Sequence, residues 1–171
     1  MKKIIITGAN GVGKSLFASK LAKARPDVPV ISIDEMKLQT NWQKRTRIEI
    51  ETALARALEK DAWILEGGPG FLSQAIAQAD ALVWLDPPEY VRALQLAVRP
   101  WKNFGQTRPE LPPGNLDWPL QQYFFALRSL KNKSKFRSCI SEAFRCASGF
   151  EKWQCRNKHD RIAVVSRWSS V

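Results

Sequence analysis

The stretch IIITGANGVGKSLF, residues 4–17, joins three isoleucines to a glycine-rich turn and then to a lysine and a serine. Its residues 8–15, GANGVGKS, match the phosphate-loop pattern G-x-x-x-x-G-K-[ST]. Glycines in such a loop allow successive backbone N–H groups to surround one anion, and the helix that follows points the positive end of its dipole at the same anion. The stretch therefore predicts a strand, a phosphate-binding turn and a helix.

Each polar residue of this loop has an expected task. Lys14 would reach the β- and γ-phosphates of a nucleotide, and the Ser15 hydroxyl would bind Mg²⁺. A turn without a ligand is one alternative, and a dinucleotide-binding turn on Gly8, Gly11 and Gly13 is another, but neither requires lysine and serine here. We therefore expect nucleotide contacts from the whole loop: Gly8, Ala9, Asn10, Gly11, Val12, Gly13, Lys14, Ser15 and Leu16.

Length and composition exclude several classes of protein. The 171 residues suffice for one domain with its own core. No apolar run approaches the roughly 20 residues that span a bilayer, and the N-terminus leads straight into a strand without a signal-peptide pattern. Three cysteines without C-x-x-C spacing and a single histidine argue against a zinc site. We expect free thiols, a cytoplasmic location and no membrane partner.

Charge is unevenly distributed along the chain, whose formal net charge is +11. Residues 1–98 hold 13 Lys and Arg against 11 Asp and Glu, whereas residues 99–171 hold 14 against 5. This basic C-terminal half could hold the phosphates of a nucleotide or, without sequence specificity, a nucleic-acid backbone. The alternative is a basic surface that serves solubility alone.

Strand-like and helix-like segments alternate along the chain. Apolar runs predict strands at residues 2–7, 28–33, 62–65, 81–85 and 161–165. Apolar residues at helical spacing predict a helix from near Lys14 to Pro26 and further helices at 43–60, 71–79, 89–98 and 116–137. Strands that are apolar on both faces belong in a parallel sheet with helices on each side. We therefore expect one three-layer α/β domain over residues 1–171.

Acidic residues follow three of the predicted strands. Because the carboxyl ends of parallel strands meet at one edge, Asp34, Glu66 and Asp86 should lie near the phosphate loop. Asp34 is the first candidate for a base that accepts the proton of an acceptor hydroxyl; capping of the next helix is the alternative. Glu66 is a second candidate base, or a Mg²⁺ ligand through water, or else a partner of turn amides. Asp86, before two prolines, is expected to form a turn and cap a helix.

Two segments depart from the alternating pattern. Residues 99–117, RPWKNFGQTRPELPPGNLD, mix prolines, glycines and basic residues without periodicity, which favours a lid, a binding loop or disorder. Residues 138–160 also lack regular periodicity, and we expect a divergent helix or a partly ordered tail there.

Taken together, the stretches GANGVGKS, ISIDE, EGGPG and GQTRPELPPGNLDWPLQQYFF resemble the adenylate-kinase-like P-loop proteins, and most closely their DNA topology modulation (FlaR-like) branch. The resemblance covers about residues 1–137 and the last strand. It implies a sheet order of 2-3-1-4-5, ATP and Mg²⁺ on the phosphate loop, and a lid over that loop.

Matched by motif, the resemblance also implies roles for single residues. Asp34 falls where relatives place the phosphate acceptor, and Arg99 and Arg108 fall where relatives supply arginines to the transferring phosphoryl group. Trp168, with Arg167 beside it, falls where relatives contact the adenine. One difference bears on the binding of the acceptor. Relatives often carry an arginine soon after the third strand, whereas here the first arginine after that strand is Arg92.

These observations support a leading function and two alternatives. The leading hypothesis is an ATP-dependent kinase for a small molecule or nucleotide, with Lys14, Asp34, Glu66, Arg99 and Arg108 as catalytic residues and with Ser15 and Glu66 at the metal. The second is a nucleic-acid-binding ATPase or a polynucleotide-end kinase that affects DNA topology. The third is a nucleotide-binding protein that has lost catalysis.

Overall fold

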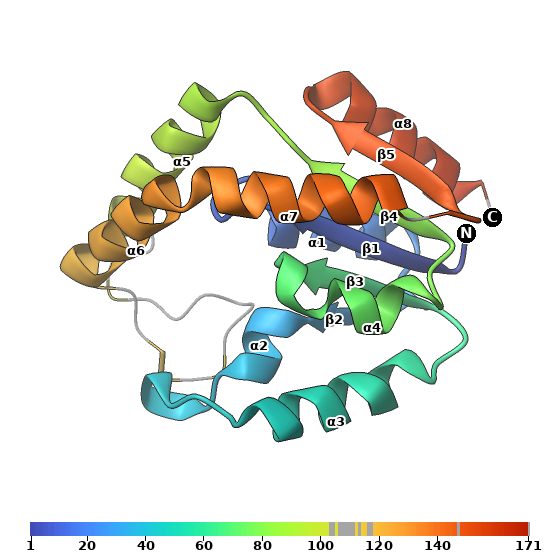
Figure 1. The fold of residues 1–171 in the computed structure, drawn as a ribbon, viewed down its shortest axis with the longest axis horizontal. Helices are drawn as coiled ribbons and strands as arrows, with labels where there is room; N and C mark the ends of the chain where they lie inside the picture. The colour runs from blue at the N-terminus through green and yellow to red at the C-terminus, as the bar shows by residue number, and fades with distance from the viewer. Residues whose placement is uncertain (103–104, 106–111, 113, 116–117, 147, 171) are drawn as a thin grey trace.

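The computed structural model describes residues 1–102, 105, 112, 114–115, 118–146 and 148–170 of the chain. In that part of the chain, a parallel five-stranded sheet has the order β2-β3-β1-β4-β5 (Figure 1). Its strands are β1 Lys3–Gly8, β2 Val30–Ser32, β3 Trp63–Gly67, β4 Ala81–Leu85 and β5 Glu151–Cys155. The predicted α/β class and the sheet order are therefore confirmed.

Helices cover both faces of this sheet (Figure 1). The longer α-helices are α1 Lys14–Ala24, α3 Arg47–Leu58, α5 Glu89–Lys102, α6 Pro119–Lys131, α7 Lys133–Cys146 and α8 Lys158–Ser169. Two short α-helices, α2 Ile33–Lys37 and α4 Leu72–Ile76, and two 3₁₀ turns, η1 Thr40–Trp42 and η2 Pro69–Phe71, complete the described elements.

The core lies in two layers, one on each face of the sheet. Successive side chains of a strand point to opposite faces, so Ile4 and Ile6 pack on one side and Ile5 on the other. Helices α1 and α8 fill the first layer with Phe17, Leu21, Val164 and Trp168. Helix α3 fills the second with Leu54 and Leu58, and Phe144 of α7 packs against its edge. Burial on both faces explains why the central strands consist almost entirely of apolar residues.

The fifth strand was predicted in the wrong place. Residues 161–165 lie inside α8, and β5 is Glu151–Cys155, within the segment where we expected a divergent helix or a tail. Asn157 and Asp160 form a capping box that starts α8, and Val164 and Trp168 then lie one turn apart on its buried face. The apolar run at 162–165 is thus one stripe of a helix. As an edge strand paired with β4, β5 has a mixed sequence without an apolar signature.

Several predicted boundaries also change. The second strand ends at Ser32, because that residue caps α2. The helix expected at 116–137 is two helices, α6 and α7, and α7 continues to Cys146. The helix expected from residue 43 begins at Arg47 instead, after Thr46 forms a capping box with Glu49. Of the predicted lid at 99–117, residues 99–102 complete α5, and most of the remainder lies outside the described residues.

The Trp168 side chain does not lie where the family resemblance implied. It is fully buried in the first core layer, and its indole N–H donates to the Leu21 carbonyl at 3.0 Å. The Arg25 guanidinium covers the ring at 4.5 Å from its centroid. Trp168 therefore fastens α8 to α1, and the expected adenine contact from this side chain is wrong.

Close packing at Gly8 leads to a stability prediction. A Cβ atom added there would lie 2.7 Å from the Leu85 carbonyl oxygen and 2.9 Å from Val12 Cγ2, and the backbone φ is +153°. We expect Gly8→Ala to lower the free energy of unfolding by about 2–4 kcal/mol, because both the backbone strain and the clash must be absorbed. The control Gly68→Ala, where an added Cβ meets nothing within 4 Å, should change it little. Urea denaturation of the two variants measures the difference. Equal stability of the two variants would contradict the close packing at Gly8.

Candidate active site

The phosphate loop connects β1 to α1 at the carboxyl edge of the sheet. Gly8, Gly11 and Gly13 all have positive φ, at 153°, 84° and 83°. A Cβ atom at Gly11 would also meet the Leu96 side chain at 2.7 Å. The left-handed turn at Gly13 leads directly into α1, so its first amide groups open toward the loop. The loop thus has the backbone shape that anion binding requires.

Lys14 lies beneath this loop as a buried cation. Its Nζ donates to the carbonyl oxygens of Gly8 at 3.2 Å and Ala9 at 3.1 Å, and the residue is 8 % exposed. Burial lowers the pKa of the ammonium, while the nearby Asp34 and Glu66 carboxylates raise it again. The lysine predicted from the motif is therefore held inside the loop.

Glu66, at the end of β3, is the buried carboxylate of the site. Its Oε1 accepts from the Ser32 hydroxyl at 2.8 Å and the Ser15 hydroxyl at 3.3 Å, and the residue is 2 % exposed. Burial raises the pKa of Glu66, although both hydroxyl groups and Lys14 oppose the shift. The structure thus brings Ser15 and Glu66 together and adds Ser32. Sequence reasoning missed Ser32, because the predicted second strand continued to residue 33 and gave no sign that Ser32 ends it and caps α2.

Asp34 lies in the first turn of α2, close enough to act electrostatically on Lys14 and Glu66. Its carboxylate pairs with Lys37 at 3.2 Å and remains half exposed. The capping role belongs to Ser32, whose hydroxyl accepts from the backbone N–H of Glu35 at 3.4 Å. The alternative reading of Asp34 as the helix cap is therefore wrong, and its carboxylate is open to other partners.

The oxygen atoms of this site are of the kind that bind a magnesium ion. Mg²⁺ prefers oxygen ligands and is commonly held by one or two carboxylates together with substrate phosphates and water. The Ser15 hydroxyl and the Glu66 carboxylate lie 3.3 Å apart beside the loop, which is such a ligand set. Within the described ranges, no group of three or more His, Cys, Asp or Glu residues could hold a metal ion by itself.

Asp86 lies beside the phosphate loop, where the sequence placed it, and its carboxylate accepts hydrogen bonds from side chains of other elements. Its Oδ2 accepts from Gln154 Nε2 at 2.8 Å and from Arg137 at 2.9 Å, so the carboxylate ties the end of β4 to β5 and α7. It lines a small pocket beside the phosphate loop, together with Ala9, Val12, Trp84 and Arg92 among others. The predicted helix-capping role is replaced by this link.

Two arginines that sequence reasoning missed lie against the loop. Arg92 of α5 is 1 % exposed, and its guanidinium donates to the Asn10 carbonyl at 3.5 Å and the Ser129 hydroxyl at 3.2 Å. Arg161 of α8 donates to the Val12 carbonyl at 3.3 Å. Neither has a local signal, since each reaches the loop only through the packing of its helix.

The two arginines that the family resemblance indicated are placed differently. Arg99 is half-buried near the end of α5, about one turn after Leu96, the residue that packs against Gly11. Arg108 lies outside the described residues. Leu16 is 65 % exposed, on the first turn of α1.

Of the residues predicted for the catalytic site, the structure brings together Lys14, Ser15, Asp34 and Glu66.

Comparison with solved structures identifies the fold. A shikimate kinase from Bacteroides thetaiotaomicron aligns with a TM-score of 0.51 at 18 % identity, covering 98 % of this chain and 96 % of that one. A gluconokinase from Sinorhizobium meliloti 1021 aligns with a TM-score of 0.52 at 15 % identity, covering 99 % and 94 %. This chain has the P-loop kinase fold. At such identities the likeness concerns the fold alone.

Other comparisons add little to this result. TT1252 from Thermus thermophilus aligns with a TM-score of 0.57 at 13 % identity, covering 98 % of this chain and 96 % of that one. No protein-family model and no curated protein sequence matches the chain. No helix among the described residues of this P-loop kinase fold is long and apolar enough to cross a membrane.

The buried Glu66 carboxylate predicts a pH-dependent stability. Its pKa is higher in the folded than in the unfolded chain, so its contribution is fully favourable below the unfolded value and is lost as pH rises through the folded value. We expect Glu66→Gln to be more stable than the wild type at pH 8, because a neutral amide then replaces the buried Glu66 carboxylate, and to lose this advantage near pH 4. Thermal unfolding across this range measures the difference.

The matched control is Glu59→Gln, which removes an exposed carboxylate just after α3. It should follow the wild-type pH profile. A Glu66→Gln profile parallel to that of the wild type would contradict the buried charge.

Proposed function

We propose that this protein is an ATP-dependent kinase that transfers the γ-phosphate to a small-molecule or nucleotide acceptor. The observation that carries the proposal is the meeting of Lys14, Ser15 and Glu66 at one phosphate loop of correct backbone shape. The kinase fold of the structural neighbours supports it, and a shikimate kinase among them was solved with shikimate bound.

The proposed donor site is the phosphate loop. The loop amides and the dipole of α1 would bind the phosphates of ATP, and Lys14 would neutralise charge on the β- and γ-phosphates. Bound Mg²⁺ would neutralise further charge on the same phosphates, held by Ser15 and, directly or through water, by Glu66. Arg161 and Arg92 lie against the loop backbone and would hold its shape.

The proposed acceptor side lies at α2. As the acceptor oxygen attacks the γ-phosphorus and the bond to the ADP oxygen breaks, the hydroxyl proton would pass to a carboxylate. Asp34 is the best placed, because it is half exposed beside the loop and is not used as a helix cap. Phosphoryl transfer depends chiefly on positioning and charge neutralisation, so one base and a cationic loop would suffice.

Further parts of the proposal rest on the family resemblance. By the resemblance, Arg99, near the end of α5, would supply positive charge to the transferring phosphoryl group, whereas Arg108 and most of the predicted lid lie outside the described residues. Closeness to the DNA topology modulation branch would rest on GQTRPELPPGNLDWPLQQYFF, most of which precedes α6. A polynucleotide end as acceptor is the second candidate, which the excess of Lys and Arg after residue 98 favours.

Titration calorimetry with Mg²⁺–ATP tests the donor site. We expect Lys14→Ala to weaken binding about 10- to 150-fold, because hydrogen bonds from a charged group contribute about 1.5–3 kcal/mol each. Lys20→Ala, on the exposed side of the same helix, is the control and should bind ATP as the wild type does. Absence of binding by the wild type, or equal binding by Lys14→Ala, would refute the donor site.

Acceptor screening tests the transfer itself, with [γ-³²P]ATP and a panel of nucleoside monophosphates, sugar acids and oligonucleotide ends. For the acceptor that is labelled, we expect Asp34→Asn to lower kcat about 10²- to 10⁴-fold, because a general base is lost, with little change in ATP affinity. Glu35→Gln, the exposed neighbour, should retain activity. Tight ATP binding without transfer to any acceptor would favour a nucleotide-binding protein without catalysis.

A further inference from the structure

One end of the molecule carries exposed aromatic side chains on and around α6. Phe124 is 73 % exposed, Phe125 49 %, and Trp118, just before the helix, 55 %. At the end of α5, Trp101 is 70 % exposed and its indole N–H donates to the Tyr123 hydroxyl at 2.8 Å. Large aromatic rings bury readily, so a group of them left in solvent marks a surface that binds something.

The 3₁₀ turn η1 contacts these aromatic side chains through Trp42. The Trp42 and Phe125 ring centroids lie 6.4 Å apart, with an angle of 32° between the planes. Asn41 and Trp42 both adopt left-handed backbone conformations, with φ of 57° and 58°. The buried Asn115 holds this turn by accepting from the Trp42 backbone N–H and by donating to the Gln39 carbonyl. Trp42 is therefore held against α6 in a backbone conformation that is strained for a residue other than glycine.

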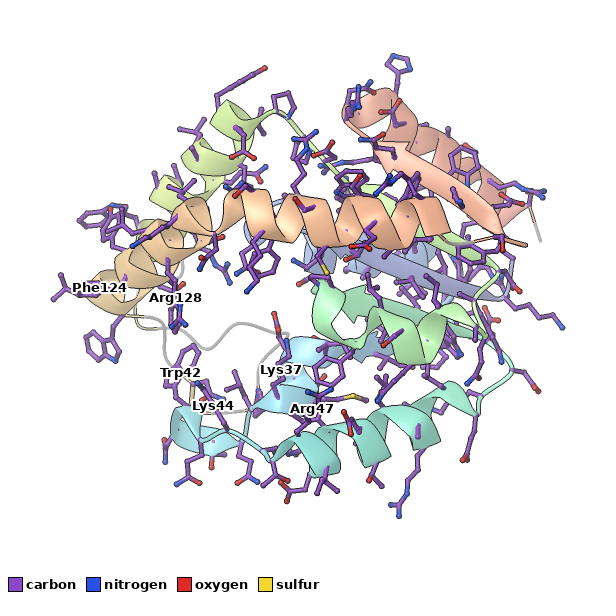
Figure 2. All side chains as sticks on the ribbon, in the orientation of Figure 1. Lys37, Trp42, Lys44, Arg47, Phe124 and Arg128 are labelled. Carbon is purple, nitrogen blue, oxygen red and sulfur yellow. The ribbon has the colours of Figure 1, made fainter. Side chains whose placement is uncertain are left out.

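Basic side chains come from the same two parts of the molecule as these rings. Figure 2 shows Lys37, Trp42, Lys44 and Arg47 on one side, from α2 to the start of α3, with Phe124 and Arg128 opposite on α6. Lys44, Arg47 and Arg128 are exposed. Phe124 and Arg128 are four residues apart and share one face of α6. We call this set the α6–η1 surface, defined by Lys37, Trp42, Lys44, Arg47, Phe124 and Arg128.

We propose that the α6–η1 surface binds single-stranded nucleic acid without sequence specificity. Cationic side chains that follow a phosphate backbone, interleaved with aromatic rings on which bases stack, are the means by which proteins hold single strands. The bases of a duplex are already stacked on each other, so its phosphates could use the cations but its bases could not use the rings. Two of the four cations, Lys37 and Arg47, pair with Asp34 and Glu51, and Lys44 and Arg128 are therefore the stronger candidates for phosphate contacts.

Charge also decides between a nucleic acid and a second copy of this chain. Two copies that met through this surface would bring Lys44 and Arg128 close to their own equivalents, at a cost in repulsion. A polyanion gains from the same charges through release of its counterions. The proposal goes beyond phosphoryl transfer and does not depend on it, because binding requires neither ATP nor an acceptor hydroxyl.

Fluorescence anisotropy of the full chain with fluorescein-labelled dT15, without ATP, tests the proposal. We expect binding that weakens with a slope of log K against log salt between about −1.4, for contacts from Lys44 and Arg128, and about −2.8, for contacts from all four cations, since each phosphate contact on a single strand contributes about −0.7. Unlabelled dT15 should compete better than a 15-base-pair duplex. Absence of binding at 50 mM salt, or equal competition by the duplex, would overturn the proposal.

Variants then locate the surface. We expect Phe124→Ala, which removes an exposed ring and leaves the core intact, to weaken binding at least about 5-fold, the lower limit for loss of one stacked base. The Lys44→Glu, Arg128→Glu double variant should weaken it further and reduce the salt slope by about 1.4.

Matched controls carry the same changes elsewhere. Tyr90→Ala removes a ring of similar exposure, 75 %, near the start of α5, and the Lys20→Glu, Lys23→Glu double variant reverses two exposed charges on α1. Both should bind as the wild type does; equal losses in the control pair would show that net charge alone is responsible, against the proposal. Sedimentation velocity gives the final check: a wild-type dimer that Phe124→Ala dissociates would identify this surface as a self-association interface instead.

Discussion

The position of β1 at the centre of a parallel sheet is the constraint on which the site depends. Its register pairs Ile6 with Glu66 on β3 and Gly8 with Leu85 on β4. Parallel strands in this register end at the same edge, so the phosphate loop, the Glu66 carboxylate and the end of β4 must meet there. A shift of one residue would exchange the two core faces and would turn Glu66 away from Ser15.

This arrangement buries a carboxylate and an ammonium close together, each with a pKa moved toward its neutral form. Burial of charge is costly, and a pair of apolar residues in the same volume would often be at least as stable. A bound ligand would offset this cost if its phosphates paired with the Lys14 ammonium and its cation paired with the Glu66 carboxylate. Serine hydroxyl groups from α1 and from the end of β2 meanwhile satisfy the Glu66 carboxylate.

The errors of prediction have separate physical causes. An edge strand such as β5, with the sequence EKWQC, is not required to be apolar on both faces, and therefore carried no signal. The apolar residues of α8 were close enough in sequence to imitate a strand, although the capping box of Asn157 and Asp160 was present to indicate a helix. Arg92 was visible only as an arginine that came too late in the chain to match the family pattern, yet packing brings it to the loop.

Sequence alone determined the strand, loop and helix at residues 3–24 and the buried strands β3 and β4, because glycine conformations, helix starts and burial on two faces each leave a local pattern. It also placed Lys14, Ser15 and Glu66 at one edge, since parallel strands end together. Only the tertiary structure decided that Ser32 and Ser15 would share the Glu66 carboxylate, 34 and 51 residues away in the chain, and that Arg161 would reach the Val12 carbonyl from α8. Those contacts depend on how whole helices pack, and no local pattern records the direction in which a packed helix presents its side chains.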